Sequence, residues 1–69
     1  MMGEVEAVVL EASTFDLHGV RYVDATVTYP SGGTETARLG PEGAPGDLEP
    51  GERVLVTRVV NQIVSIRRP

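Results

Sequence analysis

The sequence predicts a single all-β domain, a small barrel of five strands. Apolar residues do not recur at the helical spacing of three and four in any window of a dozen residues. The apolar segments are instead rich in Val, Thr, Ile and Tyr, which favour strands, and Gly and Pro interrupt them at short intervals. With 69 residues the chain has room for one domain, residues 1–69.

The N-terminal part predicts one strand followed by a loop. The strand covers residues 4–12, and its second half is apolar on both faces, as in a long, bent barrel strand. Residues 13–19 hold turn-forming side chains around Phe15 and Leu17. We therefore expect a loop here, in which these two side chains plug one end of the barrel.

The central part predicts a hairpin. A second strand covers residues 20–29. Apolar and polar positions alternate strictly there, so that one face is buried and the other is exposed to solvent. Residues 30–33 supply a turn, and a third strand covers residues 34–39. The inward positions of the second strand are Val23, Ala25, Val27 and Tyr29.

The C-terminal part predicts an irregular connector and a second hairpin. Residues 40–51 contain four Gly and three Pro and show no helical pattern, and strands follow over residues 52–60 and 62–68. A three-strand meander, a connector and a terminal hairpin is the order of an oligonucleotide/oligosaccharide-binding (OB) type barrel. An SH3-like barrel shares this order and is the alternative. The long first strand favours the OB-like barrel.

The terminal hairpin also predicts an interaction surface. If Asn61 and Gln62 form a two-residue turn, Val59 lies opposite Val64, and opposed residues share a face. The core lining is then Leu55, Thr57, Val59, Val64 and Ile66. The second face is also largely apolar, so we expect self-association or partner docking there. The residues of this predicted interface are Val54, Val56, Arg58, Val60, Ile63 and Arg67.

Composition disfavours catalysis and nucleic-acid binding. The chain has no Cys and one His, His18, so it lacks a metal-ligand set and a paired nucleophile and base. We therefore expect no enzyme activity, no cofactor and no small-molecule substrate. The net charge is −4, and residues 1–37 hold six acids against Arg21 alone. Nucleic-acid binders normally carry a basic field, because contacts to phosphates supply most of their affinity.

A nucleic-acid face is nevertheless the second hypothesis. Barrels of this kind bind single strands through exposed aromatic residues and arginines on the second and third strands. Tyr22 has the outward parity on the second strand, and Arg21 and Arg38 are the basic residues near it. These three residues form the candidate face.

Two stretches of the chain carry a family resemblance. They are residues 19–25, GVRYVDA, and residues 48–60, LEPGERVLVTRVV, which lead into residues 63–69, IVSIRRP. These stretches resemble the C-terminal domain of NfeD-like proteins, a small OB-type barrel. The resemblance covers about half of the chain, which differs from the family by lacking membrane helices and by an insertion over residues 29–47. It implies a non-catalytic interaction module.

The resulting hypothesis is a non-enzymatic protein-interaction module that binds a protein partner or a second copy of itself. The alternative is an RNA or single-stranded DNA binder of the translation-factor kind. The first residues carry acids where a signal peptide needs positive charge, and no stretch approaches the length of a membrane span. We therefore expect a cytoplasmic protein without membrane insertion.

Overall fold

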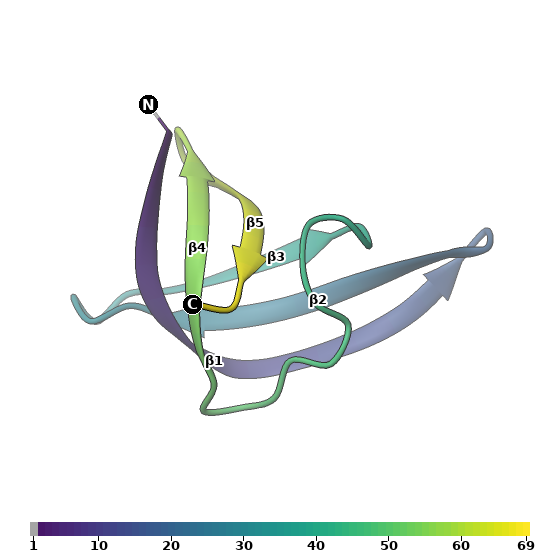
Figure 1. The fold of residues 1–69 in the computed structure, drawn as a ribbon, viewed down its shortest axis with the longest axis horizontal. Coiled ribbons are helices and arrows are strands. Elements are labelled where there is room, and N and C mark those ends of the chain that lie inside the picture. Colours follow the sequence, from purple (N-terminus) through teal and green to yellow (C-terminus); the bar gives the residue numbers. More distant parts are fainter. Residues whose placement is uncertain (1) are drawn as a thin grey trace.

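The computed structural model describes residues 2–69 and contains one five-stranded antiparallel sheet (Figure 1). The strands are β1 (Met2–Leu17), β2 (Val20–Thr28), β3 (Thr34–Leu39), β4 (Arg53–Val59) and β5 (Gln62–Arg67). Their order across the sheet is β3-β2-β1-β4-β5, and no helix occurs over the described residues. The prediction of an all-β chain with five strands is confirmed.

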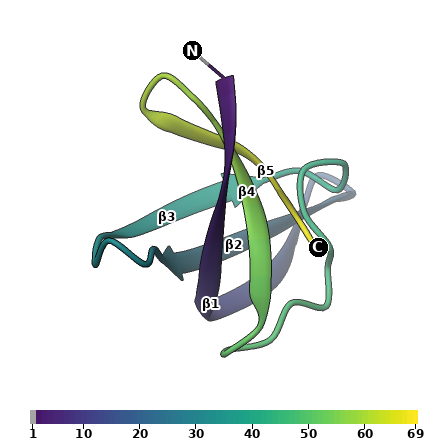
Figure 2. The same cartoon turned by 60° about the vertical axis from the view of Figure 1, so that its left-hand side comes forward.

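β1 lies at the centre of the sheet and changes partner halfway along its length. Residues 2–8 pair with β4, and residues 8–17 pair with β2. The register shifts between Val9 and Glu11, which leaves Leu10 as the extra residue of a β-bulge. Bulges bend a strand and increase its twist, and Figures 1 and 2 show β1 curving between its two halves.

The predicted loop over residues 13–19 is wrong, because β1 continues to Leu17. The turn consists of His18 and Gly19 alone, with φ angles of 52° and 79°. Positive φ at both central residues is what a type I′ hairpin turn requires. Leu17 is 48% exposed, so it does not plug a barrel end. The turn-forming residues of this segment are accommodated within a strand, where Phe15 pairs with β2.

The predicted β2–β3 hairpin is confirmed. Val23, Ala25 and Val27 are each at most 2% exposed, whereas the alternate positions of β2 are partly exposed. Val23 pairs with Leu39 and Thr28 with Thr34, at the two ends of the ladder. The strict alternation of the sequence therefore corresponds to one buried and one outward face, as a pleated strand requires.

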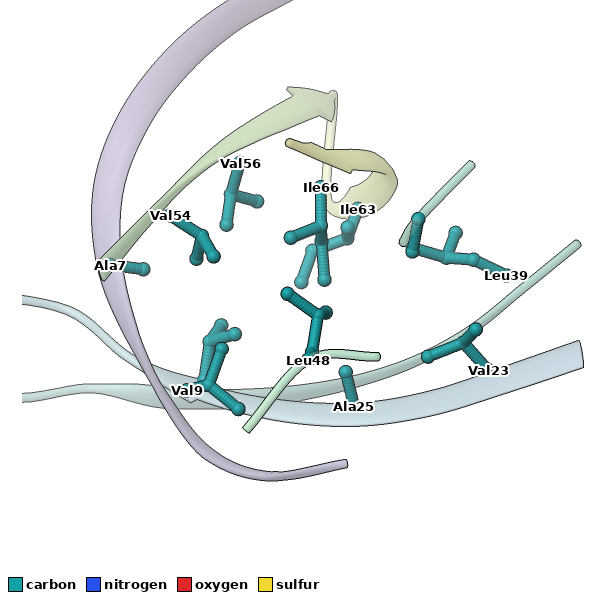
Figure 3. Packing of buried hydrophobic residues seen from close by; sticks show 12 residues of the cluster. Ala7, Val9, Val23, Ala25, Leu39, Leu48, Val54, Val56, Ile63 and Ile66 are labelled. Carbon is teal, nitrogen blue, oxygen red and sulfur yellow. The ribbon is translucent and has the colours of Figure 1, made fainter. Parts of the chain in front are cut away.

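The core lies between the two halves of the bent sheet. Figure 3 shows side chains from β1, β2, β4 and β5 pointing toward a common interior, with Leu48 of the connector among them. Ala44 and Leu48 are both buried, so the Gly/Pro-rich connector covers the core as well as joining β3 to β4. The buried residues are Ala7, Val9, Val23, Ala25, Val27, Leu39, Ala44, Leu48, Val54, Val56, Ile63 and Ile66.

The sheet is not closed into a barrel. β3 and β5 form its two edges and contact each other without a ladder of hydrogen bonds. Gly43 fills part of this opening, because its carbonyl accepts a hydrogen bond from the Ile66 N–H at 2.7 Å. A Cβ atom at Gly43 would lie 3.1 Å from the Cβ of Leu39, so a larger residue would push these segments apart.

The predicted turn of the terminal hairpin is wrong by one residue. The turn consists of Val60 and Asn61, so that Val59 pairs with Gln62 instead of Val64. This changes each partner near the turn by two residues and leaves the same residues of β4 together on one face. The predicted core face of β4 is also wrong, because Val54 and Val56 are core residues, at 1% and 0% exposed.

Most of the rest of the predicted core lining is at least partly exposed. Val59 is 38% exposed and Val64 is 43% exposed, and of the five residues assigned to the core only Ile66 is buried. The register shifts again in β5, where Val64 is the extra residue between Ile63 and Ser65. This second bulge allows both Ile63 and Ile66 to face the core despite their spacing of three.

We expect the substitution Val60→Gly to stabilise the chain. Val60 has a φ of 58°, a conformation that is unfavourable for a β-branched residue, and its side chain is 67% exposed and contributes little packing. Glycine relieves a backbone strain of about 1–2 kcal/mol. This gain exceeds the cost of the greater conformational entropy that glycine gives the unfolded chain, about 0.5–1 kcal/mol. Thermal unfolding should show a midpoint raised by a few degrees; a lowered midpoint would contradict the assigned turn.

Over the described residues, no helical segment has the length and apolar character needed to cross a membrane.

Candidate interaction surface

The predicted interface on the terminal hairpin does not exist as a surface. Val54, Val56 and Ile63 are buried in the core, and Val60 lies alone at the exposed turn. Their predicted place on an outer face followed from the choice of Leu55, Thr57 and Val59 as the core lining of β4, and the structure buries the opposite face.

The two arginines of that predicted interface bind carboxylates on other strands. Arg58 Nε lies 3.0 Å from Glu35 Oε1 on β3. Arg67 Nε lies 2.7 Å from Glu4 Oε2 on β1. Through these ion pairs, both arginines connect the terminal hairpin to other strands of the sheet.

The structure brings together two of the three residues of the predicted nucleic-acid face. Tyr22 and Arg38 share the outward face of the sheet, where both approach Phe15. Phe15 stacks on Tyr22 with ring centroids 5.6 Å apart, and Arg38 Cζ lies 4.5 Å from the Phe15 ring centroid. Arg21 follows the opposite parity and binds Asp16 at 3.0 Å.

Phe15 is a surface residue that the sequence pattern does not reveal. The predicted loop over residues 13–19 gives Phe15 no partner across a strand pair, so the predicted nucleic-acid face does not include it. Once β1 extends to Leu17, Phe15 pairs directly with Tyr22. The signal in the sequence is the pair His18-Gly19, which is suited to a two-residue hairpin turn.

The paired ends of β1 and β2, residues 13–17 and 20–24, form an arm. β3 pairs with β2 only as far as Val23, so the outer part of the arm has no further strand beside it. Figure 1 shows this two-stranded ribbon extending beyond β3 and beyond the connector. The arm therefore exposes both of its faces near the turn.

One face of the arm is apolar. Leu17 pairs with Val20 as Phe15 pairs with Tyr22, and residues paired across strands point to the same side. Leu17 is 48% exposed and Val20 is 40% exposed, and the two aromatic residues are partly buried against each other. None of the four belongs to the core cluster. Phe15, Leu17, Val20 and Tyr22 are called the arm face below.

A shallow polar depression of about 600 Å³ adjoins the arm face. Across it, Arg38 makes a forked contact to Asp24 at 2.8 and 3.1 Å, and the hydroxyls of Thr26 and Thr36 are 2.8 Å apart. The hydrogen bond from Arg38 lowers the pKa of Asp24. The lining residues are Glu11, Ala12, Ser13, Asp24, Thr26, Thr36, Ala37 and Arg38.

Every arginine within residues 2–69 forms an ion pair. The pairs are Arg21–Asp16, Arg38–Asp24, Arg53–Glu6, Arg58–Glu35, Arg67–Glu4 and Arg68 with both Asp47 and Glu52. Among the described contacts, each arginine is therefore already paired with a carboxylate and is not free to bind a phosphate. Glu11, which lines the depression, has no cationic partner among these contacts. The surface around the arm is consequently neutral to acidic.

A second polar cluster joins the residue that follows β2 to β3 and β4. The Tyr29 hydroxyl donates to Glu35 Oε1 at 2.6 Å, and Arg58 donates from Nε and Nη2 at 3.0 and 3.3 Å. The hydrogen bond from Tyr29 and the ion pair with Arg58 lower the pKa of Glu35. Burial, aided by the bond to Glu35, raises the pKa of Tyr29 to about 12. These groups satisfy one another, so we assign the cluster a structural role.

No group of three or more His, Cys, Asp or Glu side chains suited to holding a metal ion occurs in the part of the chain that the structure describes. No family model, curated protein or solved structure matches this chain.

Proposed function

We propose that this chain is a non-enzymatic protein-interaction module that binds its partner through the arm face. The observation that carries the proposal is the arm itself, which places four adjacent apolar side chains on one face outside the core. Single exposed apolar residues are common on proteins, but a contiguous group of them marks an interaction site. The NfeD-like stretches of the sequence favour the same class of function.

We further propose that the sheet is an open form of the OB-type barrel. In support of this, β1 lies between β2 and β4, and the edge strands β3 and β5 approach each other. An SH3-like barrel pairs its first strand with its last, whereas β1 here pairs with β4. Ligands of OB-type barrels bind across the second and third strands and the loop between the first two, which is the region of the arm face.

Replacing the two most exposed residues of the arm face should weaken partner binding without unfolding the chain. The arm variant is Leu17→Ser with Val20→Thr. Leu10, 47% exposed at the bulge, and Val64, 43% exposed on β5, provide a matched control, Leu10→Ser with Val64→Thr. Both pairs lose the same chemical groups at nearly the same exposure.

The measurement is binding to an array of short random peptides. We expect the arm variant to bind the selected peptides about tenfold more weakly, since it loses roughly 1–2 kcal/mol of apolar contact. The control should bind as the wild type does, and both should melt within a few degrees of it. Equal loss in the two variants, or no loss in either, would refute the arm face as the binding surface.

The Phe15–Tyr22 stack with Arg38 above it favours a second candidate, single-stranded nucleic acid. The Asp24 carboxylate compensates Arg38, however, which weakens any contact to phosphate. An oligonucleotide titration separates the two functions. We expect affinity no tighter than non-specific binding, roughly 10⁻⁴ to 10⁻⁶ M at physiological salt. Nanomolar affinity that is lost in Tyr22→Ala would transfer the function to nucleic acid.

A further inference from the structure

One edge of the arm has no strand beside it. β1 pairs with β4 only through residues 2–8, so beyond the bulge its edge opposite β2 is open. The last backbone contacts on that edge are those of Val9, whose N–H donates to Glu52 at 2.9 Å and whose carbonyl accepts from Gly51 at 2.7 Å. Among the described residues, no backbone hydrogen bond reaches this edge between residues 11 and 17.

The turn fixes which backbone groups face the open edge. In a hairpin with a two-residue turn, the residues that flank the turn exchange hydrogen bonds, and such pairs alternate with pairs whose polar groups point outward. Leu17 flanks the turn, so Leu17 and Phe15 direct their backbone groups toward β2. The N–H and C=O groups of Thr14 and Asp16 then point away from β2, into the open edge.

This edge lacks most of the features that normally block strand addition. Proteins protect edges with Pro, with charged side chains, especially Lys, with bulges, or with a covering loop. The charges on this edge are the carboxylates of Glu11 and Asp16, which repel an acidic strand but not a basic one. Residues 11–17 contain no Pro, Lys or Arg, and the bulge at Leu10 precedes them. The connector approaches only the base of the arm, where Gly46 and Leu48 line a cavity of about 180 Å³ together with Thr14. Figure 1 shows the outer part of β1 beyond this connector.

We propose that an extended segment of a partner protein adds to this edge of β1 as a sixth strand. The inference rests on the proposed function and specifies how the arm binds. Main-chain bonds to Thr14 and Asp16 supply affinity in this mode, and alternate side chains supply specificity. Phe15 and Leu17 lie on the outward face of the same strand, so every second residue of the added strand packs beside the arm face.

The size of the arm face indicates a peptide segment and not a folded partner. A stable interface between folded proteins buries about 800 Å² on each side. Four side chains, two of them partly buried against each other, expose at most a few hundred Å². The occupant is therefore a short extended segment, held mainly by its backbone.

The charge of the arm selects a basic segment and disfavours a second copy of this chain. Residues 11–24 hold three acids; Asp16 pairs with Arg21 and Asp24 with Arg38, and Glu11 has no cationic partner among the described contacts. Two copies paired through this edge would bring these acids together, and like charges on neighbouring strands repel. A segment in which aliphatic residues alternate with Lys or Arg complements both the charge and the apolar face.

A seven-residue peptide of alternating valine and lysine tests strand addition. Two forms of this peptide with methylated backbone nitrogens serve as matched probes. One is methylated at the backbone nitrogen of every lysine, and the other at the backbone nitrogen of every valine. Only one of these two sets of N–H groups faces β1 in an added strand, because the groups alternate. Amide hydrogen exchange of the full chain is followed by NMR, with Val9, which is already bonded, as the internal reference.

We expect the unmodified peptide to slow exchange at Thr14 and Asp16 at least tenfold, and one methylated form to lose this effect while the other retains it. Equal binding by both forms, with changes confined to the arm face, would overturn strand addition and leave the proposed function standing. No change on the arm would overturn strand addition, and the peptide array then decides the proposed function separately. Protection that rises with protein concentration alone would make a second copy the occupant and overturn the basic segment.

Discussion

Replacing Val56 with aspartate is expected to unfold the chain. Val56 is 0% exposed and pairs with Val5 on β1 and with Ile66 on β5. An unpaired carboxylate at this position costs several kcal/mol of desolvation. The total stability of a chain of this length is roughly 3–10 kcal/mol, so this one substitution removes most or all of it.

Val59→Asp provides the matched comparison, because Val59 lies on the same strand and is 38% exposed. We expect this variant to remain folded, with a melting temperature within a few degrees of the wild type. Circular dichroism during heating measures both variants. If Val59→Asp unfolds the chain and Val56→Asp does not, the buried and exposed faces of β4 are reversed.

Glu35→Ala is expected to lower the melting temperature by roughly 5–10 °C. Glu35 accepts hydrogen bonds from Tyr29 and Arg58 and so connects the edge strand β3 with β4. Without it, the partly buried Tyr29 hydroxyl loses its acceptor, which costs about 1–2 kcal/mol. The control is Glu42→Ala on the connector, an exposed carboxylate with no ion pair among the described contacts, and it should leave the melting temperature unchanged.

Acidification should reduce the difference between Glu35→Ala and the wild type. The pKa of Glu35 is lowered in the folded chain, chiefly by the hydrogen bond from Tyr29 and also by Arg58. A carboxyl with a lowered pKa stabilises the fold fully above its ordinary value, and this contribution is lost as the pH falls through the folded value. Melting curves from neutral pH to below the carboxyl range measure the effect. A difference that does not change with pH would show that the Glu35 charge is irrelevant.

The sequence predicted the strands whose signal is local. In β2, the alternation of Val23, Ala25 and Val27 with polar residues corresponds to burial on one face, and the hairpin to β3 followed from it. The connector was predicted as irregular, and it is, although burial of Ala44 and Leu48 within it carried no sequence signal. An alternating pattern predicts burial correctly because it depends only on one strand and on the face of that strand that meets the core.

The features that position the candidate surface were harder to predict because they depend on register. Rules for turn residues favour Asn over Val at positive φ, yet Val60 adopts a φ of 58°. The bulges at Leu10 and Val64 shift the alternation of β1 and β5, and neither is marked by Gly or Pro. Ser13, Thr14 and Asp16 are typical turn residues, and only pairing with β2 makes them part of a strand. The arm was therefore missed as an element, and its face with it.

The division of β1 between two partners also determines the order in which the fold can form. Residues 8–17 reach β2 through a two-residue turn, so this pairing forms early and locally. Residues 2–8 must wait for β4, since Glu6 and Arg53 are 47 residues apart, and Glu4 and Arg67 are 63 residues apart. During synthesis, Ala7 therefore remains without its partner Val54 until β4 is complete. Closure of this long loop is expected to limit the folding rate, and to place it with the slower, non-local β proteins.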